Sequence, residues 1–132
     1  MKTLTRIVAT LVAGAFLIGA AWAGNMAARI GNTVVATAPD GTVTKFWYKA
    51  DGTFTAKVAQ PGKPVVDTKG KWRQDGDKLC ITSEAAFGPF EANKERCVPL
   101  MGDNVGDKWK SQSLGADGKP VEVDVTIVAG AG

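Results

Sequence analysis

The sequence predicts an all-β domain: a small antiparallel meander of seven or eight strands that forms a barrel or a two-layer sandwich and carries one disulfide. Short runs rich in β-branched and aromatic residues alternate with glycine-containing turns along most of the chain. After residue 23, no stretch of about ten or more residues has the apolar period of a helix. Sequential hairpins favour an up-and-down strand order, and closure would remove exposed strand edges.

The first 23 residues have the features of a secretory signal peptide. Lys2 and Arg6 precede an uncharged run over 7–20, and the tripeptide A-W-A ending at Ala23 offers small residues to a signal peptidase. We therefore expect cleavage near Ala23 and a periplasmic or secreted protein, with an uncleaved N-terminal anchor as the alternative. The apolar run is shorter than the ~20 residues of a spanning helix, and we expect no transmembrane span in the mature chain.

Residues 24–31 are weakly patterned and predict a flexible N-terminal arm, which is followed by a β-domain over 32–128. The domain opens with strands over 32–38, 43–49 and 53–59, joined by Asp-Gly turns in which glycine supplies a positive φ. In the third run, Phe54, Ala56 and Val58 share one face. The prolines within 60–64 then end this meander, because proline cannot donate to a strand ladder.

The second half of the chain has the same pattern of short strands separated by turns. Strands are expected over 65–74, 78–83, 95–101, 105–114 and 121–128, with turns between them and a bridging segment over 84–94. The last strand has the clearest alternation, because four aliphatic residues point one way and polar residues the other; the four are Val121, Val123, Val125 and Ile127. Residues 129–132 have nothing to pack against and should fray.

The two cysteines, Cys80 and Cys97, predict one intramolecular disulfide, because an even count in an exported protein favours pairing. Closing a loop of this size contributes about 3 kcal/mol in the chain-entropy description. Each cysteine lies off the more apolar face of its strand, so the disulfide should lie outside the core or across a barrel corner. The chain has no C-x-x-C motif and no histidine, so we predict neither a redox pair nor a metal site.

Catalytic sets are absent from the sequence. Without histidine the commonest general base is missing, and Ser83 and Ser113 have no recognisable base or G-x-S-x-G context. Asp75 and Asp77 are explained by their turn, and no glycine-rich phosphate loop occurs. We therefore predict no enzymatic activity, no catalytic residues and no cofactor.

Charge is distributed unevenly along the chain. Removal of residues 1–23 takes away Lys2 and Arg6, so a formal net charge of +3 becomes +1, and we expect no nucleic-acid partner. Residues 45–73 carry a local charge of +5, whereas 74–132 carry −4. The positive stretch predicts either a face for an anionic partner or solvated outward positions of strands, where lysine also protects sheet edges.

Aromatic residues supply the candidate binding surface. Trp47 must point away from the face used by Phe46 and Tyr48, and it lies between Lys45 and Lys49. An exposed tryptophan beside lysines suits a polysaccharide, a lipid headgroup or a protein, while the alternative is that the N-terminal segment covers it. Two further candidates, Phe87 and Phe90, either form an aromatic tip that inserts into a partner or a lid that closes one barrel end.

The run from residue 70 to 97 carries a family resemblance. Its G-K-W at 70–72 resembles the G-x-W motif of lipocalins, although it stands further along the chain than it does in that family. The chain more closely resembles small exported one-disulfide β-domain proteins of proteobacteria, on the residues Gly70, Trp72, Asp77, Leu79, Cys80 and Cys97. The resemblance implies a periplasmic β-domain with one disulfide and implies no catalytic residues.

These observations favour a non-catalytic binding or interaction domain of the cell envelope, which we expect to be a monomer. One alternative is a small secreted inhibitor of a protease or lysozyme, with the N-terminal arm or the loop around Phe87 and Phe90 as the inserted element. A second alternative is a carrier of a small hydrophobic ligand with a lipocalin-like barrel. A solidly filled interior would exclude the carrier, since a small barrel has room only for side chains or one small ligand.

Overall fold

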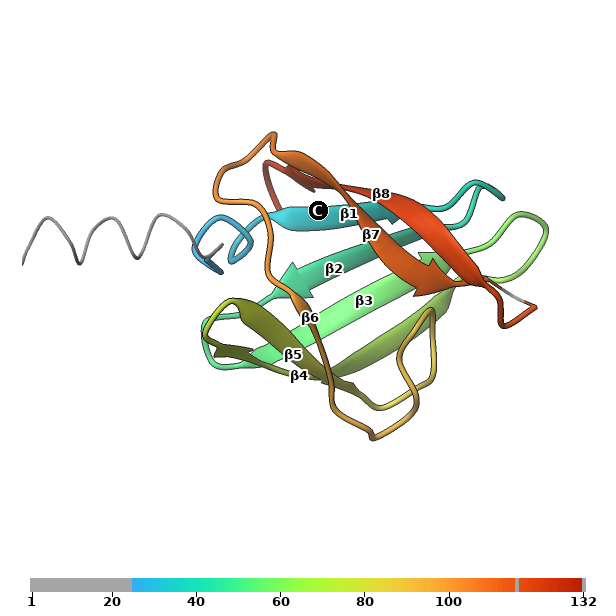
Figure 1. Ribbon diagram of the computed structural model, residues 1–132, viewed down its shortest axis with the longest axis horizontal. Coiled ribbons are helices and arrows are strands. Elements are labelled where there is room, and N and C mark those ends of the chain that lie inside the picture. Colours follow the sequence, from blue (N-terminus) through green and yellow to red (C-terminus); the bar gives the residue numbers. More distant parts are fainter. Residues whose placement is uncertain (1–24, 116, 132) are drawn as a thin grey trace, which may run out of the picture.

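The computed structural model describes residues 25–115 and 117–131, and these residues form one curled β-sheet without an α-helix (Figure 1). The prediction of an all-β domain with seven or eight antiparallel strands is confirmed. The eight strands are β1 (Thr33–Thr37), β2 (Val43–Tyr48), β3 (Thr53–Ala59), β4 (Val66–Asp75), β5 (Lys78–Ser83), β6 (Arg96–Pro99), β7 (Lys108–Leu114) and β8 (Pro120–Val128).

The sheet has the strand order β6-β5-β4-β3-β2-β1-β8-β7, and each neighbouring pair is antiparallel. The first six strands follow one another as a meander, while β8 returns to pair with β1 and carries β7 on its outer side. The sheet curls into a half-barrel rather than splitting into two layers (Figure 1). Within the described chain β6 and β7 do not pair with each other, so the half-barrel has two free edges.

Alternation along the strands decides which face becomes the core. In β3, Phe54, Ala56 and Val58 are buried while their neighbours in sequence are exposed or half-buried. In β8, Val123, Val125 and Ile127 are buried in the same way. All of these side chains point to the concave face, because residues two apart lie on the same side of a strand. The predicted inward residues of these two strands therefore form the core.

Aspartate side chains fix the Asp-Gly turns. The Oδ1 atoms of Asp40, Asp51 and Asp117 each accept a hydrogen bond from the backbone N–H two residues later, at 2.9–3.0 Å. The following glycines, Gly41, Gly52 and Gly118, have φ between +77° and +92°, a range that other residues rarely adopt. The hydrogen bonds from Thr53 hold the pKa of the Asp51 carboxyl below its usual value.

Gly70 lets β4 pack tightly against its neighbours. A Cβ atom at this position would overlap the Thr82 carbonyl oxygen and would lie 2.8 Å from the Phe54 ring. The position faces the buried side of the sheet, where Phe54 is 1% exposed. The glycine of the G-x-W run is therefore required by close packing in the sheet.

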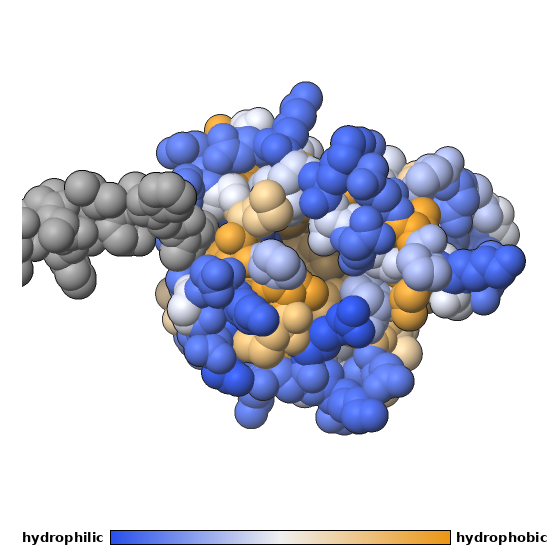
Figure 2. All heavy atoms as spheres, viewed as in Figure 1, coloured by the Kyte–Doolittle hydropathy of each residue, from blue (hydrophilic) through white to orange (hydrophobic). Residues whose placement is uncertain are grey.

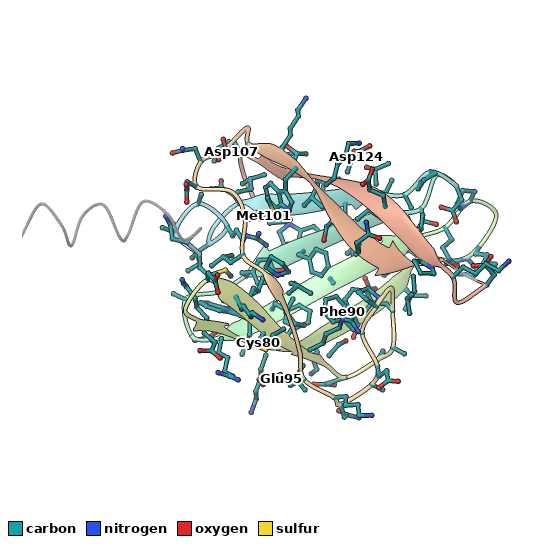
Figure 3. The ribbon with its side chains drawn as sticks, in the orientation of Figure 1. Cys80, Phe90, Glu95, Met101, Asp107 and Asp124 are labelled. Carbon is teal, nitrogen blue, oxygen red and sulfur yellow. A yellow bond between two sulfur atoms is a disulfide. The ribbon has the colours of Figure 1, made fainter. Side chains whose placement is uncertain are left out.

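The predicted disulfide between Cys80 and Cys97 is confirmed, with the two residues directly opposite each other on β5 and β6 and a Cα–Cα distance of 3.9 Å. The neighbouring pair, Leu79 and Val98, contributes to the core, so the sulfur atoms lie on the convex face. Glu95 lies just before β6 at this edge of the sheet (Figure 3), and its carboxylate accepts a bidentate pair of hydrogen bonds from the Arg73 guanidinium at 2.8–2.9 Å. The disulfide thus ties the short edge strand to the sheet from outside.

The segment before β1 packs against the sheet. Of the flexible arm predicted over residues 24–31, the described part, 25–31, forms a hydrogen-bonded turn in which Met26 and Arg29 are buried. Near the other terminus, Gly130 bonds through its N–H to Asn32 and through its carbonyl to Thr33, at positions expected to fray. The predicted signal peptide lies outside the described residues. In the part of the chain that the structure describes, no helix has the length and apolar character needed to cross a membrane.

Candidate functional site

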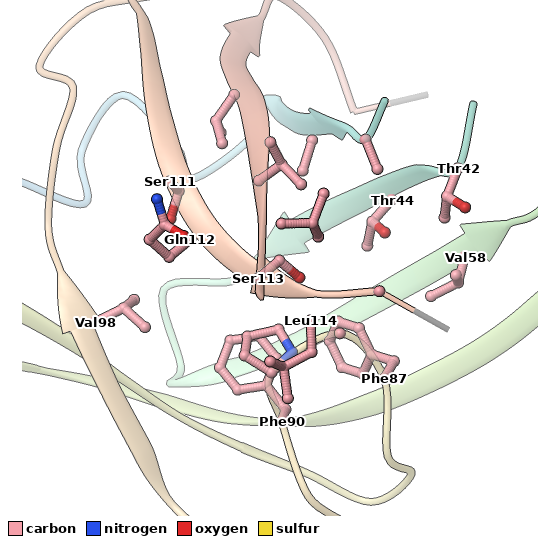
Figure 4. Close-up of a pocket in the computed structure, with 18 of the residues that line it drawn as sticks. Thr42, Thr44, Val58, Phe87, Phe90, Val98, Ser111, Gln112, Ser113 and Leu114 are labelled. Atoms are coloured by element: carbon pink, nitrogen blue, oxygen red, sulfur yellow. The ribbon is translucent and has the colours of Figure 1, made fainter. Parts of the chain in front are cut away.

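The concave face of the half-barrel surrounds a cavity of about 680 Å³. Side chains from seven of the eight strands line it, and only β4 does not contribute. Most of the lining is aliphatic or aromatic, and Figure 4 shows it from the side of β7. The cavity falls within the ~300–1,000 Å³ that ligand pockets usually occupy.

Small side chains on the facing strands leave this space open. Ser111 and Ser113 point inward from β7, where their half-buried positions alternate with exposed ones. Across the cavity, β1 and β2 contribute Ala36 and Thr44 where larger residues would fill the interior. The interior is therefore not solidly filled, which keeps the carrier alternative open.

The cavity opens between the two free edges of the sheet. Figure 2 shows an apolar hollow on this side of the molecule, bordered by polar side chains. Residues of two turns at one end also line it: Thr42 from the β1–β2 turn, and Asp117 and Lys119 from the β7–β8 turn. A ligand can thus reach the interior without breaking any of the backbone hydrogen bonds between paired strands.

Phe87 and Phe90 form part of the cavity wall. The backbone N–H groups of these two residues donate to each other's carbonyl oxygens at 3.0 and 2.9 Å, and their rings lie 5.1 Å apart. The Phe87 ring also lies 5.7 Å from that of Phe46, and Phe90 is buried. Both residues thus line the interior of the half-barrel, and the choice between an inserting tip and a lid stays a prediction.

Arg29 is the charged residue of the cavity lining that is most deeply buried, with 5% of its surface exposed. Its guanidinium carbon lies 5.1 Å from the centre of the Trp109 ring and 5.8 Å from that of Tyr48. Its Nη2 atom donates to the Met101 carbonyl oxygen at 2.7 Å, and Figure 3 places Met101 on the segment between β6 and β7. Sequence reasoning missed this residue, since a lone arginine in a weakly patterned segment is expected at the surface.

Burial controls the acid–base behaviour at this end of the cavity. Loss of hydration lowers the pKa of the Arg29 guanidinium, and the nearby Tyr48 hydroxyl partly offsets that shift. Burial likewise raises the pKa of the Tyr48 hydroxyl, with a smaller opposing effect from Arg29. At neutral pH the pair therefore consists of a charged arginine and a neutral tyrosine.

Trp47 lies on the opposite, convex face with Lys45 and Lys49. Its Nε1 donates to the Thr33 hydroxyl at 2.9 Å, and its ring is half-buried, whereas both lysines are exposed. Trp47 and Lys49 border an outer groove of about 1,240 Å³ together with Lys57, Asp67, Lys69 and Glu84. The structure thus brings Lys45 and Trp47 of β2 together with Lys49, which follows that strand, and separates these three residues from Phe87 and Phe90, which face the interior.

No protein-family model matches the sequence, and no curated protein matches it either. The chemistry of the site therefore has to be read from its geometry. Within residues 25–115 and 117–131, the one cluster with three potential metal ligands consists of Cys80, Glu95 and Cys97. Both of its sulfur atoms belong to the disulfide and are not thiolate ligands.

Proposed function

We propose that this protein is a non-catalytic binding protein that holds a small, largely apolar ligand in the cavity of its half-barrel. The supporting observation is the open interior of about 680 Å³ with an apolar lining. At about 30 Å³ for each water-sized group, this space accommodates a ligand of about 20 heavy atoms. A binding energy of ~0.3 kcal/mol per atom then corresponds to a Kd on the order of tens of micromolar.

The other predicted functions have less support. An inhibitor that inserts its N-terminal arm or its phenylalanine loop needs a protruding element, but Met26 and Phe90 are buried in the domain. A surface centred on Trp47 would offer a half-buried ring whose N–H already donates to Thr33. These features favour the interior over the convex face as the binding site.

We also propose that the protein works outside the cytoplasm, as a monomer. The disulfide supports an oxidising compartment, because such bonds are rare in proteins of the cytosol. The predicted signal peptide gives the same expectation. Cell fractionation with an antibody against the natural protein tests this location, and recovery in the cytosolic fraction would contradict it.

A neutral apolar fluorophore, N-phenyl-1-naphthylamine, tests the proposed cavity. We expect saturable fluorescence enhancement at a single site, with a Kd on the order of a hundred micromolar. Ser111→Phe should weaken this binding at least tenfold, because the new ring would enter the cavity from β7.

The matched control is Lys108→Phe, which places the same ring on the outward face of the same strand. This variant should bind the fluorophore like the natural protein. If the natural protein gives no saturable signal, or if both variants lose it equally, the cavity is not a binding site.

A further inference from the structure

The cavity wall contains a buried positive charge. Arg29 is 5% exposed, and an arginine remains protonated at neutral pH even where burial disfavours the charge. A buried cation is costly unless an anion pairs with it and its N–H groups find acceptors. The anions and hydrogen-bond acceptors around Arg29 therefore determine how well this charge is stabilised.

The protein supplies only part of what this guanidinium needs. Met101 accepts one hydrogen bond from Nη2, while the buried Nε has no hydrogen-bond acceptor among the described residues. No carboxylate of residues 25–115 and 117–131 forms an ion pair with Arg29, and the remaining positions of the sequence contain no Asp or Glu. An anionic partner from the protein's own side chains is thus lacking.

The acidic residues nearest along the chain to Met101 have other partners. The Asp107 carboxylate accepts hydrogen bonds from the backbone N–H groups of Asp103 and Asn104, at 2.8 and 3.0 Å. Asp103 accepts one from the Asn25 side chain at 3.4 Å. The Tyr48 hydroxyl is a further neutral partner, because its hydrogen bond with the Arg29 side chain raises the pKa of Arg29 against the effect of burial. The rings of Tyr48 and Trp109 also lie against the guanidinium, and neutral partners of these kinds stabilise a buried cation less than a carboxylate does.

The place of Arg29 in the cavity suggests how a ligand would lie. Arg29 contacts Tyr48 at the last residue of β2, whereas Thr42 lines the cavity just before the first residue of that strand. Six residues of strand span about 16–20 Å, so the charge and the turn at the other end are separated by about that length. The wall between them is mostly apolar.

From this geometry we infer that the ligand is a single-chain carboxylate amphiphile, of about 12–18 carbons, whose carboxylate pairs with Arg29 and whose chain fills the apolar cavity. The inference rests on the proposed function and specifies the chemistry of its ligand. The planar guanidinium suits a carboxylate, since it can donate two parallel hydrogen bonds. A purely structural arginine would only tie the N-terminal turn to Met101 and would show no preference among ligand headgroups.

Headgroup preference provides the test. Dodecanoate, 1-dodecanol and dodecyl phosphate are each used to displace N-phenyl-1-naphthylamine from the full-length protein. We expect dodecanoate to bind at least ten times more tightly than the alcohol. Arg29→Met, which keeps the apolar volume and removes the charge, should abolish this preference while the affinities of the fluorophore and the alcohol change less than about threefold.

The matched control is Lys119→Met, which removes an exposed positive charge from the rim of the same cavity. This variant should keep the full preference for the carboxylate. Loss of the preference in Lys119→Met but not in Arg29→Met would place the headgroup at the rim and overturn the inference. Tighter binding of dodecyl phosphate than of dodecanoate would overturn the assignment of a carboxylate.

A measurement on the natural protein avoids any folding defect of Arg29→Met. The NMR signal of carboxyl-labelled dodecanoate follows the ionisation of the bound headgroup. Paired with Arg29, the bound carboxyl should stay ionised well below its pKa in water. Titration at the pKa of the free acid would show that the headgroup is in solvent and would refute the inference. Equal binding of the acid and the alcohol would refute it too while leaving the proposed cavity function intact, whereas failure of all probes to bind would refute that function itself.

Discussion

Reduction of the disulfide between Cys80 and Cys97 should destabilise the domain by about 3 kcal/mol. The two residues are 17 apart in sequence, and in the chain-entropy description a loop of that size restricts the unfolded chain by about this amount. For a domain of this size, 3 kcal/mol corresponds to a fall in Tm of about 10–20 °C. The structure places this effect at one edge, because among the described strands β6 pairs with β5 alone, and it has four residues.

Reduced natural protein is a better comparison than a variant. Cys80 is 1% exposed, so a substitution there would add the cost of a buried cavity or of an unpaired hydroxyl. Thermal unfolding is followed by circular dichroism with and without a reductant, and the difference in Tm measures the effect. Alkylation of the free thiols in a parallel sample confirms that the disulfide has been reduced. Hydrogen exchange should show that the amides of residues 96–98 and of Leu100 lose protection first. A change in Tm below about 3 °C would refute the assignment of the disulfide as a main stabilising element.

Three further changes test other parts of the structure. Gly70→Ala should destabilise by more than about 1 kcal/mol, because the new Cβ would overlap the Thr82 carbonyl; denaturant unfolding measures this, and a neutral or stabilising effect would contradict the close packing. Phe54→Ala should cost about 3–5 kcal/mol, as the ring is 1% exposed in the core, and a loss below about 1 kcal/mol would show that the concave face is loosely packed. Asp51 has a folded-state pKa below its unfolded value, so its contribution to stability is present above the unfolded pKa of about 4 and is lost as pH falls through the folded pKa. Asp51→Asn should therefore unfold with a shallower dependence of Tm on pH in that acidic range, and an unchanged slope would contradict this origin.

The strands could be predicted from the sequence because their signals are local. The alternation of Val121, Val123, Val125 and Ile127 and the Asp-Gly turns specify strands and hairpins from neighbouring residues alone. The boundaries differ where longer-range contacts intervene: the strand expected over 95–101 pairs only over 96–99, since the Leu100 N–H donates to the Asp77 carbonyl instead.

The cavity and Arg29 could not be predicted in the same way. Interior volume depends on how far the whole sheet curls, and no alternation pattern encodes that. Likewise, the sequence around Arg29 lacks any periodic signal, and its burial arises because the N-terminal turn meets Tyr48, Trp109 and Met101 from three distant segments. For Phe87 and Phe90 the sequence left two roles open, and only their contacts with each other and with Phe46 show that both line the interior.

Because the edges of β6 and β7 are free, the circumference of the curled sheet is not fixed by strand pairing. In a closed barrel, strand number and register fix the circumference and with it the interior. Here the separation between the two edges can change while every ladder from β6 through to β7 stays paired. For the proposed binding function this means that molecules of different thickness can be enclosed by the same set of hydrogen bonds, because the described strands lack the eighth pairing, between β6 and β7, that would close the sheet.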